Sequence, residues 1–134
     1  MAKQFLYACA LLSSILVVSV SAFEPSLFVA HTIQSSIQYV EMGDPNGGKL
    51  YIEAQIASLT TLQKTSVLDS TKHIVFHTTY PKDKIVAYYM LNNLKPDLYT
   101  IQPALNWIRL QISLIDLHDQ SRWKEFVIEI YKGL

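Results

Sequence analysis

Apolar residues recur at every second position in several stretches of this chain. The clearest stretch is 107–114, in which four aliphatic side chains alternate with Trp107 and three polar residues. Successive side chains of a β-strand point to opposite faces of the sheet, so this alternation is typical of a strand with one buried face. The same pattern recurs in three further stretches: 50–56, 73–80 and 126–131.

Turn-forming residues separate these stretches. Residues 43–48 combine glycines with aspartate, proline and asparagine, and residues 80–84 and 116–122 resemble hairpin loops. The run 85–91 is apolar on both faces, which indicates a central strand. The sequence therefore predicts an all-β domain, a small antiparallel β-sandwich or barrel of about six to eight strands.

Two further stretches are left without an assigned conformation. Residues 57–71 are rich in serine and threonine, and Leu59 and Leu62 also fit a helical turn. Residues 92–103 contain two prolines and are typical of a long connection.

The first 22 residues have the pattern of a cleaved signal peptide. Lys3 precedes an apolar run, and Val20-Ser21-Ala22 places small residues at the −3 and −1 positions of a cleavage site before Phe23. A retained anchor is the alternative, but it needs about 20 predominantly apolar residues. We therefore expect one domain over residues 23–134 that is secreted into an extracellular fluid and makes no membrane contact after cleavage.

Composition limits what such a domain can do. The only cysteine, Cys9, lies within the leader, so we expect a domain without disulfides. Lysines plus arginines number 11, as do the acids, and removal of Lys3 leaves a net charge of about −1. Nucleic acids require a positive patch, and this balanced, interspersed charge argues against direct nucleic-acid binding. We expect no cofactor.

Three groups of residues resemble chemical sites. His73 and His77 share a face of the expected strand, but four residues of strand span about 13 Å, too far for one metal ion. The segment 116–119 offers Asp116, His118 and Asp119 as ligands, yet hairpin tips commonly contain such residues. Ser121 beside them lacks the strand–turn–helix elbow of a nucleophilic serine. We expect no metal site, no catalytic residue and no enzymatic activity.

Aromatic residues provide a second candidate. Tyr51, Trp107 and Tyr131 fall on the strand faces opposite the aliphatic residues. Tyrosine and tryptophan supply large contact areas with a polar group, which suits an interaction surface. Cross-strand pairing that stiffens an exposed sheet is the alternative.

Two segments carry a family resemblance. Residues 73–91 combine a hydrophobic stretch, Thr79-Tyr80-Pro81, a charged turn and Ile85-Val86-Ala87, and the chain closes on Phe-Val-Ile-Glu-Ile-Tyr-Lys-Gly within residues 123–134. This order resembles the insect multiprotein bridging factor two family, whose members include salivary secreted peptides. The family has a glycine-rich turn where this chain has Pro-Ala-Leu-Asn at 103–106.

The resemblance implies a β-rich, non-enzymatic interaction protein and transfers no functional residue. We accordingly expect a small secreted binding protein that acts through contacts with an extracellular protein. The alternative is an extracellular carrier of a lipophilic small ligand, which the high aliphatic content permits. An enzyme is the third class, and it lacks a convergent polar cluster.

Overall fold

The computed structural model describes residues 23–132, and over this range it contains only helices. The predicted all-β sandwich or barrel is therefore wrong, and no strand occurs within the described residues. The predicted signal peptide, residues 1–22, lies outside them. The elements are α2 (Pro25–Glu41), α3 (Pro45–Ala57), α4 (Thr61–His77), α5 (Pro81–Leu94), the 3₁₀-helix η2 (Gln102–Ala104), α6 (Leu105–Ser113), the 3₁₀-helix η3 (Leu117–Asp119) and α7 (Gln120–Tyr131).

Helix α6 shows why the alternating pattern was misleading. An alternating series also contains residues four apart, which lie on one face of a helix. Ile108 and Ile112 are buried, whereas Leu110 and Leu114 are 56% and 63% exposed. Only every second member of the alternating series therefore faces the core. The same is true of the stretches 50–56 and 126–131, where residues four apart are buried and those between are exposed.

The residues interpreted as turns mark the ends of helices. Gly43 has a φ of 87° and follows α2, while the Asp44 carboxylate accepts a hydrogen bond from the Gly47 amide at 2.9 Å and caps α3. Proline occupies the first turn of α2, α3 and α5, where its missing amide hydrogen costs nothing. Pro81 therefore starts a helix, and the predicted hairpin loop at 80–84 is wrong. The predicted hairpin at 116–122 is instead η3 and the start of α7.

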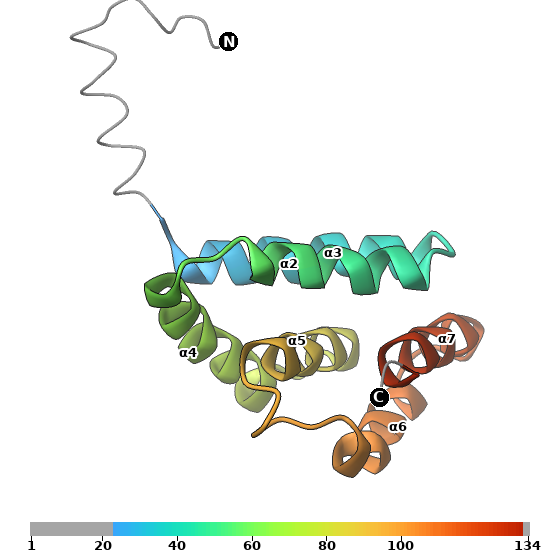
Figure 1. The fold of residues 1–134 in the computed structure, drawn as a ribbon. Helices are drawn as coiled ribbons and strands as arrows, with labels where there is room; N and C mark the ends of the chain where they lie inside the picture. The colour runs from blue at the N-terminus through green and yellow to red at the C-terminus, as the bar shows by residue number, and fades with distance from the viewer. Residues whose placement is uncertain (1–22, 133–134) are drawn as a thin grey trace, which may run out of the picture.

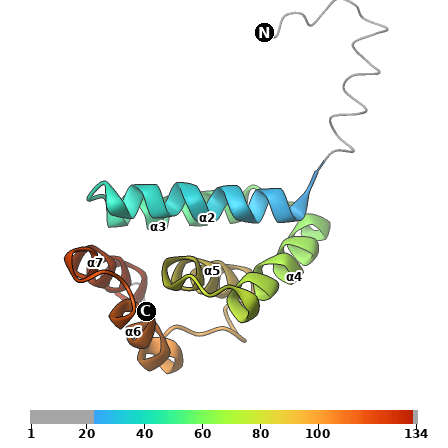
Figure 2. The same ribbon diagram turned by 180° about the vertical axis from the view of Figure 1, so that it is seen from behind.

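The helices form two layers. Figure 1 shows α2 and α3 side by side as an antiparallel pair, with α4, α5, α6 and α7 in a second layer below them. Figure 2 shows the same arrangement from behind. Helix α2 packs on α4, α5 and α7 as well as on α3, so it covers most of the second layer.

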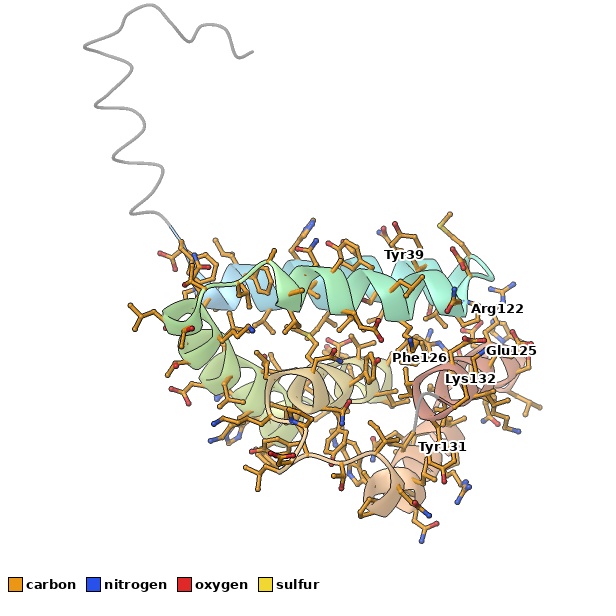
Figure 3. The ribbon with its side chains drawn as sticks, in the orientation of Figure 1. Tyr39, Arg122, Glu125, Phe126, Tyr131 and Lys132 are labelled. Carbon is orange, nitrogen blue, oxygen red and sulfur yellow. The ribbon has the colours of Figure 1, made fainter. Side chains whose placement is uncertain are left out.

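The core lies between these layers. Trp123 and Phe126 of α7 are fully buried, and the centroids of their rings are 5.5 Å apart. Figure 3 shows Phe126 on α7, the helix that packs against α3. Helix α5 buries a nearly continuous apolar run, so its predicted central position is right although its predicted strand conformation is wrong. None of the described helices combines the length and the apolar character needed to span a membrane.

Candidate functional site

An aromatic groove opens between α4, α5 and the start of α6. Its volume is about 310 Å³, and it lies where the connection 95–104 crosses the second layer. Four of its eight side chains are aromatic and only one is charged. We call this the aromatic groove, and its residues are Val75, Phe76, Lys84, Tyr88, Leu91, Tyr99, Ala104 and Trp107.

Tyr88 is central to the aromatic groove. The centroid of its ring lies 5.6 Å from that of Trp107 and 6.1 Å from that of Tyr99, which it approaches edge-on. Both separations are typical of favourable aromatic pairs. The Tyr88 hydroxyl donates to the Thr100 carbonyl at 2.9 Å, and the Asn92 amide donates to the Tyr99 carbonyl at 2.8 Å. These bonds fix the connection onto α5, so the groove walls are held in place without a ligand. Burial, together with the nearby Tyr99, raises the pKa of Tyr88.

Lys84 is the one charged residue of the aromatic groove. It lies one helical turn before Tyr88, and its side chain is half-buried. Within residues 23–132 no carboxylate forms a salt bridge with it. A lysine in such a place buries its methylene stem along apolar surface and leaves its ammonium group available at the rim.

The exposed ring of Phe76 extends the apolar surface beyond the aromatic groove. Phe76 lies on α4 and is 67% exposed. Small-molecule sites are commonly concave and apolar, have volumes of about 300–1,000 Å³, and carry few polar groups. The aromatic groove has this composition at the small end of that range, so it suits a compact apolar molecule with one anionic group.

The three aromatic residues of the predicted interaction surface do not share one site. Trp107 lines the aromatic groove, whereas Tyr51 packs against Tyr39 at 5.6 Å in a shallow groove on the α2–α3 layer. Tyr131 lines a third groove between α6 and α7. Figure 3 shows Tyr39 on the upper layer and Tyr131 near α6.

His73 and His77 are closer together than the strand interpretation required. Both lie on α4, one turn apart, and their ring centroids are 4.3 Å apart. The estimated separation of about 13 Å was wrong because it assumed the rise of a strand. Both rings are exposed, and no third metal-ligating side chain joins them within the described residues.

The loop before α7 does bring its candidate ligands together. One ligand atom from each of Asp116, His118 and Asp119 lies within 4.8 Å of the others. The Asp119 carboxylate already accepts a hydrogen bond from Lys82 at 3.3 Å, so an ammonium group partly neutralises this cluster. Ser121 is exposed in the first turn of α7, and no hydrogen bond joins it to His118 in the part of the chain described.

Several residues of the aromatic groove were missed because the helical period was not applied. Lys84, Tyr88 and Leu91 are spaced four and three apart, which places them on one helix face. If the same residues formed a strand, their side chains would lie on both faces of the sheet. The proline at the start of α5 was the signal that could have led to the helical period.

The chain matches no protein-family model, no curated protein and no solved structure. The similarity to the multiprotein bridging factor two family therefore stays a prediction. Its structural content, strands within 73–91 and 123–134, is wrong for the described residues, because 73–77, 81–91 and 123–131 lie in α4, α5 and α7.

Proposed function

We propose that this protein is a non-enzymatic carrier of a small lipophilic anion, which it binds in the aromatic groove. The observation that carries the proposal is the arrangement of Tyr88, Tyr99 and Trp107 around an apolar hollow of about 310 Å³. Secretion, which the leader predicts, would place this carrier in an extracellular fluid.

The apolar walls would provide most of the affinity. Each buried methylene group of a ligand gains about 0.8 kcal/mol on leaving water. Because hydrogen bonds already hold Tyr88 and the 95–104 connection, little ordering of the walls opposes binding. Coverage of Phe76 by the ligand would remove an exposed aromatic ring from water.

Lys84 would set the charge of the ligand. It has no carboxylate partner among residues 23–132, so an anionic head group at the rim would gain a charge-assisted hydrogen bond. A medium-chain carboxylate has the required combination of an apolar body and one anionic end.

Calorimetric titration of the mature chain with decanoate and decan-1-ol tests this proposal. We expect decanoate to bind more tightly, and Lys84→Gln to remove most of that difference. Trp107→Leu should weaken both ligands about tenfold, equivalent to about 1.4 kcal/mol. The matched controls are Lys64→Gln on α4 and Tyr131→Leu, which lies outside the aromatic groove, and both should bind like the wild type. Absence of binding, or equal loss in Tyr131→Leu, contradicts the proposal.

A second candidate function, contact with an extracellular protein, has its own supporting observation. Leu110, Leu114 and Leu117 are exposed along α6 and η3, by 56%, 63% and 83%. Such rows of apolar side chains are common at protein interfaces. A pull-down from extracellular fluid tests this function. It is favoured if the wild type and Leu62→Gln both retain a partner protein and the double variant L110Q/L114Q does not. Leu62 lies on another helix, α4, and is 82% exposed.

A further inference from the structure

A second and larger cavity lies at the start of α5. Its volume is about 470 Å³, and it is bounded by α2, the first turn of α5 and the segment after α6. Ile37 and Ile115 are buried and form apolar parts of its wall, while Tyr80 and Asp83 contribute an aromatic ring and a carboxylate. We call it the acidic cavity.

Among the residues that the structure describes, the Asp83 carboxylate has no partner of opposite charge. It is half-buried, and within residues 23–132 it accepts no side-chain hydrogen bond and forms no salt bridge. Its neighbour Lys82 lines the same cavity but binds Glu41 and Asp119 instead. Burial raises the pKa of Asp83, because it removes part of the water that solvates the ionised carboxylate. A carboxylate in this position is stabilised by an incoming cation.

The surroundings of the acidic cavity carry an excess of carboxylates. Asp116 lines it together with Asp83, and Lys82 links it to Glu41 and Asp119. Within residues 23–132, Lys82 and Arg122 are the permanently charged cations bound to this cluster, and Arg122 donates to the Glu41 carbonyl. His118, which carries a charge only when protonated, lies 3.6 Å from Asp119. Carboxylates that gather in a concave site attract cationic ligands and repel anionic ones.

Tyr80 supplies a second element for recognition of a cation. Its side chain is 68% exposed although it is large and apolar over most of its area. Its amide donates to the Thr78 hydroxyl at 3.3 Å, which holds the backbone just before α5. Organic ammonium ions bind to the faces of aromatic rings as well as to carboxylates.

We propose that the acidic cavity binds a small organic ammonium ion, with its charged group on Asp83 and its apolar body against Ile37, Ile115 and Tyr80. This site is separate from the aromatic groove, and the inference does not depend on the carrier proposal. A competing explanation is that Asp83 only stabilises the positive N-terminal end of α5, where acids are common.

Calorimetric titration with three ligands of similar shape distinguishes the two explanations. The probes are phenethylammonium, 2-phenylethanol and 3-phenylpropionate, which differ in the charge of the terminal group. We expect phenethylammonium to bind at least tenfold more tightly than the alcohol, and the carboxylate to show no binding that Asp83→Asn removes. Equal binding of the ammonium and the alcohol, or no binding of the ammonium, would overturn the proposal without any variant.

The variant Asp83→Asn tests the residue itself. We expect it to lose at least tenfold in phenethylammonium affinity, while decanoate binding at the aromatic groove stays unchanged. Its melting temperature at pH 7 should equal or exceed that of the wild type, because a poorly solvated charge has been removed. The control Asp97→Asn changes an exposed acid in the connection after α5 and should bind like the wild type. A lowered melting temperature with unchanged ammonium affinity would show that Asp83 serves only the helix end.

Discussion

Lys82 of α5 donates a hydrogen bond to the carboxylate of Glu41, although 41 residues separate them in the chain. The same ammonium group reaches the Asp119 carboxylate at 3.3 Å. One lysine thereby joins the end of α2, the start of α5 and the segment before α7. Burial alone would lower the pKa of Lys82, but the hydrogen bonds and charges of Glu41 and Asp119 outweigh it and raise the pKa.

Lys82→Met should therefore destabilise the fold. The three side chains are partly exposed, so solvent screening limits the loss to about 1 kcal/mol. Since the pKa is raised above its usual 10.5, this stability is fully present at neutral pH and is lost as the pH rises through the folded pKa. Urea unfolding at low and at 1 M salt measures the effect, which should shrink at high salt. The exposed-lysine control Lys64→Met should change little.

A second long-range contact joins α5 to α3. The Tyr89 hydroxyl donates to the Glu53 carboxylate at 2.5 Å, and Lys49 binds the same oxygen at 2.9 Å. Burial alone would raise the pKa of Glu53, but the hydrogen bonds from Tyr89 and Lys49 outweigh it and lower the pKa. The stability this gives is present above the unfolded value of about 4.5 and is lost as the pH falls through the folded pKa.

Tyr89→Phe should weaken this pH dependence and leave the part that Lys49 contributes. At pH 7 we expect a loss of about 1 kcal/mol, at the lower end for a hydrogen bond to a charged group because Glu53 is partly exposed. Urea unfolding between pH 3 and pH 7 should show the wild type and the variant converging in acid. Tyr51→Phe, on the same helix as Glu53, is the control and should follow the wild type at every pH. A gap that stays constant down to pH 3 would contradict the assignment.

For the run 85–91, burial could be predicted from the sequence better than conformation. The sequence places the run 85–91 at the centre of the fold, and six of its seven residues are indeed buried, although they form part of a helix. A short continuous apolar run fits either conformation, so periodicity alone does not decide. Thr60 and Gln63 form a reciprocal capping box before α4, in a stretch that was left unassigned. Helix-start signals of this kind were informative where alternation was not.

The candidate sites were harder to predict for the same reason. Trp107 was singled out, but its companions Tyr88 and Lys84 become neighbours only when α5 and α6 coil and pack together. Asp83 lines the acidic cavity together with residues of α2 and of the segment after α6, which are far apart in the chain. Packing between helices of this kind leaves no local pattern in the sequence.

Gly43 offers a direct test of the turn between α2 and α3. Its φ of 87° is one that residues with a Cβ rarely adopt, although open space surrounds the position. Gly43→Ala should therefore cost about 1 kcal/mol from backbone strain alone. Gly43→Asn should cost less, because asparagine tolerates the left-handed conformation. Urea unfolding of the two variants measures the difference, and equal stability of Gly43→Ala and the wild type would contradict this turn.

The histidine pair on α4 tests the helical conformation itself. Imidazoles one helical turn apart can bind one transition-metal ion, whereas residues four apart in a strand cannot. Zinc at about ten times its dissociation constant should therefore stabilise the chain by about 1.4 kcal/mol at pH 7.5.

Variants of two histidines identify the site responsible. His73→Ala should abolish the zinc-dependent rise in melting temperature. His118→Ala should preserve it, because the Asp116–His118–Asp119 cluster is already partly neutralised by Lys82. If His118→Ala abolished the zinc-dependent rise in melting temperature and His73→Ala did not, the zinc would lie at the loop before α7. The zinc effect would then no longer support the helical conformation of α4. No effect in the wild type would show that the two imidazoles do not converge, as the strand interpretation requires.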